Sequence, residues 1–324
     1  MPIHSAGYRG WDGTRVPGAT RWAVIASTGV RRTWKSAWLR RMIFFAVLPT
    51  VFLAIPLFIF EQAVRTPGAW REVVDFMGVL PQTPAFLESL NTDLATATPE
   101  EIHETRHQVW AYILLTLFRY PQSMLMVLVI GIAAPPLISS DVRSRAFLIY
   151  FSRPITRLEY ILGKMGTMVF FLAMITTMPA MILYLIGVLL SPSLSVIVTT
   201  WDLPLRILAA SVMLILPTTS VALMFSSLTS ESRYAGFGWF ASWILGYVMY
   251  SIVMGLTMVS RGSLEEPGWR ELLSPYHTLG IVQEWVFGTT TDETVFVPAA
   301  MILTVATIVS LSILYRRVSS PMRA

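Results

Sequence analysis

Residues 165–190 read MGTMVFFLAMITTMPAMILYLIGVLL, an apolar run without a charged side chain. An α-helix rises about 1.5 Å per residue, so about 20 apolar residues cross the hydrocarbon core of a bilayer. This run therefore predicts a transmembrane helix. Further apolar runs predict five more, over residues 42–60, 123–138, 207–228, 235–259 and 296–315. We expect an all-α integral membrane protein with six transmembrane helices.

The composition agrees with this fold class. Of the 324 residues, 54% are hydrophobic and 13% are charged, whereas a soluble domain carries about 25% charged residues. There is no cysteine, which excludes disulfide and thiolate chemistry. The net charge of +5 indicates basic loops beside anionic lipid and not a nucleic-acid partner.

The distribution of basic residues predicts the orientation. An even number of spans leaves both termini on one side, and that side holds 17 of the 24 lysines and arginines. The positive-inside rule then places both termini in the cytoplasm. On this topology the cytoplasm holds residues 1–41, 139–164, 229–234 and 316–324, and the opposite side holds outer loops 61–122 and 260–295.

The six spans contain no Asp, Glu, Lys, Arg or His. Because a charge in the bilayer is expensive and is kept for a function, its absence argues against an ion-coupled pump. The second span is short for a bilayer. It extends back through Val109–Phe118 if residues 119–122 form an interfacial break or kink.

The transmembrane domain is expected over residues 42–315, with segments of a different kind at each end. Residues 1–19 predict a disordered basic tail, and residues 316–324 a cytoplasmic tail. Residues 20–41 predict an amphipathic helix on the inner leaflet, in which tryptophans such as Trp22 meet the lipid and arginines meet its headgroups. A solvated basic tail is the alternative.

The loop before the third span predicts a short helix parallel to the membrane. Ser139 or Ser140 would cap it and place Asp141 in its first turn. The helix should end near Ser152, because Pro154 disfavours helix at the preceding residue. Thr156 and Glu159 then form a capping box that begins the third span. A plain connector remains the alternative.

This loop resembles that of the permease subunits of ABC-2-type transporters. The family loop begins with an acidic residue and ends in a Ser-x-Pro-x-x-Arg pattern followed by Gly-Lys, which is matched here by Asp141, Ser152, Pro154, Arg157, Gly163 and Lys164. The resemblance covers most of the chain. It extends to Ser226–Arg233 at the inner end of the fourth span and to Leu273–Tyr276 in the last outer loop.

The resemblance implies an exporter that works with a separate ATPase subunit carrying ATP and Mg²⁺. It also implies a second permease chain, in a homodimer or a heterodimer, with substrate passing along the permease interface. The loop helix would be a coupling helix that docks on the ATPase. The implied contacts are Asp141, Arg143, Arg145, Phe147, Tyr150 and Arg153.

The last outer loop suits short interfacial or re-entrant helices, because aromatic residues alternate there with polar ones. The resemblance implies that this region closes the outer end of the pathway. Its candidate gate or substrate contacts are Tyr276, His277, Glu284 and Trp285. Simple anchoring at the membrane interface is the alternative.

The chain lacks a phosphate-binding loop. That motif needs Gly-x-x-x-x-Gly-Lys-Ser/Thr, but the Gly-Lys pair at 163–164 is preceded by Leu158 at the first glycine position and followed by Met165. We therefore expect no nucleotide site and no cofactor in this chain, and we expect that it is not itself an enzyme.

One alternative reading comes from His103-Glu104-Thr105-Arg106-His107, a formal His-Glu-x-x-His motif. On a helix the two histidines share a face and can bind zinc, as in a zinc-dependent membrane metalloprotease. Against it, no third ligand follows nearby, and Arg106 would repel a metal ion. We expect no metal site. A non-transporting membrane scaffold is the other alternative, and it predicts no ATPase partner.

Overall fold

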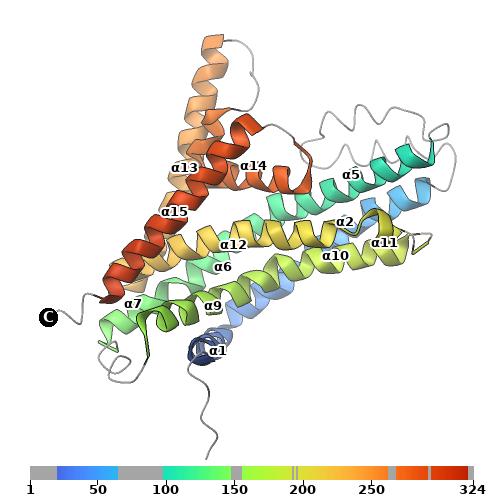
Figure 1. Cartoon of the computed structure of the whole chain (residues 1–324). Coiled ribbons are helices and arrows are strands. Elements are labelled where there is room, and N and C mark those ends of the chain that lie inside the picture. Colours follow the sequence, from blue (N-terminus) through green and yellow to red (C-terminus); the bar gives the residue numbers. More distant parts are fainter. Residues whose placement is uncertain are drawn as a thin grey trace, which may run out of the picture.

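The structure is a computed structural model that describes residues 20–64, 98–146, 155–191, 193–194, 196–261, 268–290 and 293–319. No β-strand occurs among these residues, and six helical segments are long and apolar enough to cross a membrane (Figure 1). Each contains one predicted span, which confirms the all-α, six-span membrane fold. In chain order the helices are α1 (Arg21–Trp34), α2 (Ala37–Ala63), α5 (Pro99–Leu117), η2 (Phe118–Gln122), α6 (Ser123–Ala133), α7 (Pro135–Arg143), α9 (Arg157–Ile175), α10 (Thr177–Leu190), α11 (Val196–Thr199), α12 (Leu203–Leu228), α13 (Ser232–Arg261), η3 (Trp269–Leu273), α14 (Pro275–Phe287) and α15 (Glu293–Ser319).

The second span is much longer than its predicted core of residues 123–138. It continues from α5 through η2 and α6 into α7, so the last part of the predicted outer loop 61–122 is helix. Its middle carries Arg119, of which only 6% is exposed. The prediction of spans without ionisable side chains is therefore wrong for this span.

The continuity of the second span depends on a π-helical turn, η2. Pro121 lies inside this turn and has no backbone N–H to donate. The Ser123 hydroxyl donates to the carbonyl oxygens of Phe118 (2.8 Å) and Arg119. A wider turn with side-chain hydrogen bonds lets the helix pass a proline without ending. The predicted break is therefore a local deformation within one helix.

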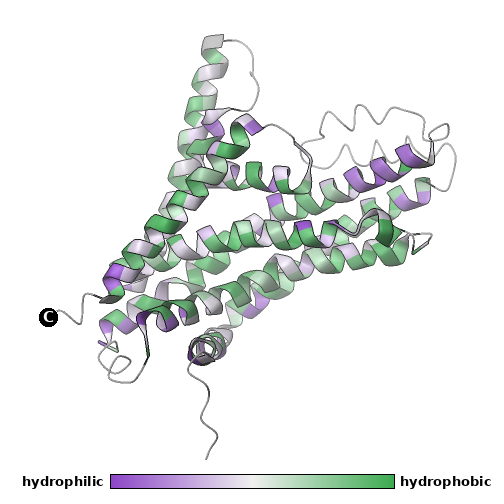
Figure 2. Ribbon diagram, viewed as in Figure 1, coloured by the Kyte–Doolittle hydropathy of each residue, from purple (hydrophilic) through white to green (hydrophobic). Residues whose placement is uncertain are grey.

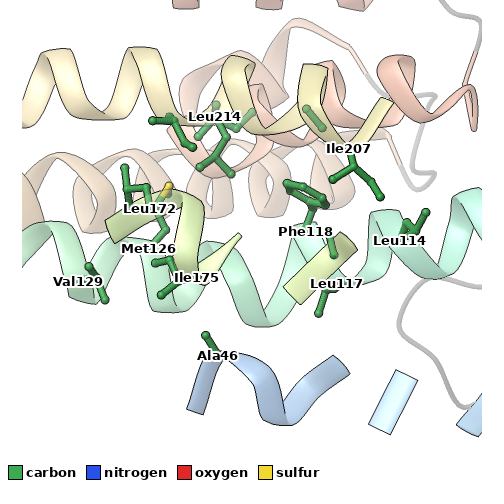
Figure 3. Packing of buried hydrophobic residues seen from close by; sticks show 14 of the residues in the cluster. Ala46, Leu114, Leu117, Phe118, Met126, Val129, Leu172, Ile175, Ile207 and Leu214 are labelled. Carbon is green, nitrogen blue, oxygen red and sulfur yellow. The ribbon is translucent and has the colours of Figure 1, made fainter. Parts of the chain in front are cut away.

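The core lies where the second span, α9–α10 and α12 meet. Phe118, Met126, Leu172 and Leu214 are at most 1% exposed, and Figure 3 shows such side chains pointing inward from these helices. Lipid tails are as apolar as these residues, so close van der Waals packing is what favours this arrangement. Hydrophilic residues gather towards the ends of the spans (Figure 2).

Helices α13 and α15 enclose a short helix, α14, instead of a plain loop. Figure 1 shows α13 and α15 inclined to the other spans, with α14 beside them, and α14 contacts α12, α13 and α15. With 13 residues, α14 is about 20 Å long and too short to cross a bilayer. It is largely buried, as expected for a re-entrant element.

The predicted amphipathic helix over residues 20–41 is two helices. α1 ends at Trp34, and Ser36 caps α2, so residues 37–41 belong to the first span. Figure 1 shows α1 nearly end-on while α9, α10 and α12 run across the view, so α1 lies across the bundle. One face of α1 packs on α9, where Gly29 meets Thr167 and Gly163 meets Ile25.

Candidate functional site

The loop after the second span begins where α7 ends. α7 starts at Pro135, because proline suits the first turn of a helix. Ser139 and Ser140 therefore lie inside α7 and not at its N-cap, and their hydroxyls donate to the carbonyls of Pro135 and Pro136 at 2.6 and 2.5 Å. The predicted cap is wrong for this reason, and Asp141 lies near the end of the helix.

Two exposed arginines mark this end of the molecule. Arg143 is the last residue of α7, and Arg145 has a left-handed φ of 51° that turns the chain away from the helix axis. Arg143 pairs with the Glu231 carboxylate at 3.7 Å, and the pair is solvent-exposed. The other implied loop residues, Phe147, Tyr150, Ser152, Arg153 and Pro154, lie outside the described residues.

Asp141 is buried and ties α7 to α9. Only 4% of it is exposed. Its Oδ2 accepts from Lys164 Nζ at 2.7 Å and from the Tyr160 hydroxyl at 2.8 Å. Asp141 and Lys164, which match the acidic and lysine positions of the family loop, thus form an ion pair with each other. Asp141 therefore holds the end of α7 on α9.

The C-terminal end of α12, the fourth span, also bonds to α7. The Ser226 hydroxyl donates to the Pro135 carbonyl at 2.6 Å and accepts from the backbone N–H groups of Ile138 and Ser139, each at 3.1 Å. Ser226 therefore bonds to three backbone groups in the first turn of α7. Ser139 also bonds to Ser232 of α13 at 2.8 Å. This end of the bundle is firmly cross-linked.

The start of the third span agrees with its prediction. Thr156 and Glu159 form a reciprocal capping box, which confirms that sequence signal. Arg157 is half-buried at the start of α9, and Gly163 is buried where α1 crosses α9. A side chain at Gly163 would collide with Ile25, so this position needs glycine for close helix packing.

A second polar region lies at the π-helical turn, far along the second span from the loop. The Arg119 guanidinium lies 3.4 Å from the Glu284 carboxylate of α14 and 5.1 Å from the centre of the Tyr276 ring. Its Nη1 presses on Gly280, where any Cβ would overlap it. Two of the four predicted gate residues, Tyr276 and Glu284, are therefore held by an arginine that the sequence analysis did not include.

The other two predicted gate residues pack against neighbouring spans. His277 is 9% exposed, and its ring stacks on Tyr250 of α13 at 3.7 Å. Burial, and next the nearby Arg119 cation, lower the pKa of His277 to about 4. Trp285 stacks on Phe296 of α15 at 4.0 Å, which makes it an anchor between α14 and α15.

Buried polar atoms without a hydrogen-bond partner concentrate in this second region. Within the described residues there are eight, and all except the Thr219 hydroxyl belong to the second span at 119–122 or to residues 274–283. Native proteins leave few such atoms, and each one asks for an explanation. The set is Arg119 Nε and Nη1, Tyr120 OH, Gln122 Oε1, Ser274 Oγ, His277 Nδ1 and Gln283 Nε2.

The His-Glu-x-x-His motif lies on α5 without a metal-binding arrangement. His107 Nε2 is 2.9 Å from both carboxylate oxygens of Asp202, whose Oδ2 also accepts from Arg206 Nε at 2.6 Å. Burial raises the pKa of Asp202, but the hydrogen bonds from His107 and Arg206 outweigh it and hold that pKa below its usual value. In the described parts of the chain, no three His, Asp or Glu residues are placed to hold a metal ion.

Arg106, inside the same motif, belongs to a buried structural contact. Its Nε is 3.1 Å from Oε1 of Glu61, which is fully buried at the end of α2 and also accepts from the Trp110 indole at 3.0 Å. This pairing joins the first and second spans. No local pattern predicts this ion pair, because Glu61 and Arg106 lie 45 residues apart.

Arg119 could have been found by treating the second apolar run as one helix. It is the only Asp, Glu, Lys or Arg between His107 and Ser140. A single charge in such a run indicates a function or a buried partner. The prediction missed it because Pro121 suggested a break.

The chain matches the model of a known family, described as ABC-2 family transporter protein, over residues 30–317. This match covers nearly all of the described helices, including α7, α9 and α14. Comparisons with curated proteins and with solved structures gave no match.

Proposed function

The chain belongs to the ABC-2 transporter family and is a multi-pass permease of an ABC transporter, and on this basis we propose that it is the membrane subunit of an exporter powered by a separate ATPase. The ATPase subunit binds ATP and Mg²⁺. A second permease chain, identical or different, completes the transporter, and substrate moves along the interface between them. The complex lies in a bacterial inner membrane with both termini in the cytoplasm.

The observation that carries this proposal is the pair of exposed arginines at the end of α7. Arg143 and Arg145 project from a helix end that is cross-linked through Asp141, Lys164 and Ser226. Arginine is enriched in protein-interface hot spots. A rigid base with exposed cations suits a docking surface for an ATPase, because force applied there moves the whole helix.

The second span then connects the ATPase to the far region. Residues 100–143 form one helical path of 44 residues, which corresponds to about 66 Å at 1.5 Å per residue. Arg119 lies on this path and contacts α14. In our proposal, movement of the α7 end changes the pairing of Arg119 with Glu284 and so opens or closes the outer end of the pathway at α14.

Charge reversal at the α7 end tests the coupling assignment. The double variant Arg143→Glu, Arg145→Glu should lose co-purification with a co-expressed ABC ATPase subunit while it remains folded in the membrane. The matched control is Arg316→Glu, Arg317→Glu, which reverses two adjacent exposed arginines at the end of α15. Unchanged co-purification of the α7 variant would remove the assignment, and failure of the wild type to bind any ABC ATPase would favour a scaffold.

No observation favours the zinc protease. His107 is occupied by Asp202, and the repulsive Arg106 has a structural partner in Glu61. We therefore do not propose it as a function. Metal analysis of the purified protein, with His103→Ala for comparison, is its direct test.

A further inference from the structure

A cavity of about 440 Å³ lies between α1 and the transmembrane bundle. One wall belongs to α1. The other is formed by the start of α2, by the junction of α6 and α7, and by α9. Its volume falls within the range of sites for small molecules, which is about 300–1,000 Å³.

The cavity exists because α1 is attached along one side. Close contacts of Gly29, Gly163 and Gly166 hold α1 against α9, and the chain turns at Ser36 to begin α2. α1 packs mainly on α9, and the cavity lies between α1 and the junction of α6 and α7. The cavity therefore results from the close packing of α1 on α9 along one side only.

The lining has the chemistry of an amphiphile site. Most of it is apolar, for example Ile25, Leu39, Ile132 and Leu137. Two cations complete it, Arg32 and Lys164. The charge of Lys164 is neutralised by Asp141, whose Oδ2 lies 2.7 Å from Lys164 Nζ.

Arg32 is the free cation of this cavity. It is exposed, and among the described residues no carboxylate pairs with it. Ser36 and Thr33 contribute hydroxyl groups to the same cavity. An unpaired guanidinium beside hydroxyl groups is a good ligand for a phosphate diester, to which arginine donates two hydrogen bonds.

We propose that this cavity binds an anionic phospholipid, with its phosphate on Arg32 and the first part of an acyl chain on the apolar wall. The membrane is the nearest source of such a molecule. α1 lies across the ends of the spans and exposes Trp22 and Trp34, and Trp38 is exposed at the start of α2. Tryptophan is typical of the lipid–water interface. The bound lipid would fix the distance between α1 and α7. The proposal rests on membrane insertion and does not depend on transport or on an ATPase.

The test is lipid retention by the purified chain in detergent. Native mass spectrometry would compare added phosphatidylglycerol with phosphatidylcholine of the same acyl chains. We expect one tightly retained phosphatidylglycerol in the wild type. Arg32→Gln should weaken its binding about fivefold to tenfold, the loss expected for one cation near a lipid phosphate. The matched control Arg31→Gln removes the neighbouring exposed charge, which does not line the cavity, and should bind as the wild type does.

A second variant separates the cavity from the charge. Thr28→Phe keeps all cations but fills the space beside Arg32, and it should also exclude the lipid. Equal retention of phosphatidylglycerol and phosphatidylcholine would overturn the proposal. So would an equal loss of phosphatidylglycerol binding in Arg31→Gln and Arg32→Gln, because either result means that the lipid does not bind at a specific site on Arg32. Thermal stabilisation by inorganic phosphate equal to that by phosphatidylglycerol would also overturn it, because the acyl chain would then contribute nothing.

Discussion

Replacement of Lys164 by methionine should destabilise the chain strongly, although the two side chains have similar length. At 2.7 Å, the attraction between Lys164 and Asp141 is about 6 kcal/mol with an effective dielectric constant near 20. Desolvation offsets much of this. Removal of one partner, however, leaves Asp141 buried as an unpaired anion, which costs about 3–5 kcal/mol. Only the Tyr160 hydroxyl would remain on the carboxylate.

The assay is unfolding of the purified chain in mixed micelles by a denaturing detergent, followed by tryptophan fluorescence. Lys164→Met combined with Asp141→Asn should recover at least about 2 kcal/mol of the loss, because no buried charge then remains. Lys35→Met removes an exposed lysine at the same end and should change stability by less than about 0.5 kcal/mol. If Lys164→Met costs less than about 1 kcal/mol, or if the two substitutions are strictly additive, the Lys164–Asp141 ion pair does not hold α7 on α9.

Three predictions concern the region around α14. Arg119→Gln should lower transport and loosen α14, seen as faster hydrogen exchange over residues 275–287. Glu284→Gln should loosen α14 at least as much, because it leaves the more deeply buried Arg119 cation unpaired. Gly280→Ala should reproduce the effect of Arg119→Gln, since a Cβ there collides with the guanidinium; normal exchange in this variant would show that the contact is not needed. The lowered pKa of His277, about 4 against an ordinary 6.5, means that the unfolded chain binds more protons between these values. Stability should therefore fall as pH decreases from about 6.5 to about 4, by at most about 1.4 kcal/mol per pH unit, and His277→Phe should reduce this slope.

Local sequence signals predicted local features well. The six spans follow from apolar length, and the capping box at Thr156 and Glu159 follows from spacing alone. Both depend on residues that are close in the chain. The loop motif was also informative, since Asp141 and Lys164 were singled out, but their mutual ion pair and their burial were not predicted.

The features that the sequence could not provide depend on contacts between distant segments. Glu61 with Arg106, and His107 with Asp202, become partners only when the helices pack. The extent of the second span was missed for another reason. Pro121 usually ends a helix, and here the Ser123 hydroxyl and a wider turn compensate for it.

In our proposal the end of α7 that carries Arg143 and Arg145 faces the cytoplasm, where an ATPase can reach it. The chain has no cysteine, so single cysteines report accessibility without background. Ser144→Cys, beside Arg143 and Arg145, should react with a membrane-impermeant maleimide only after the cells are permeabilised. His103→Cys, at the exposed start of α5, should react in intact cells. If Ser144→Cys is labelled in intact cells and His103→Cys is protected, the end of α7 faces outward and cannot dock on a cytoplasmic ATPase.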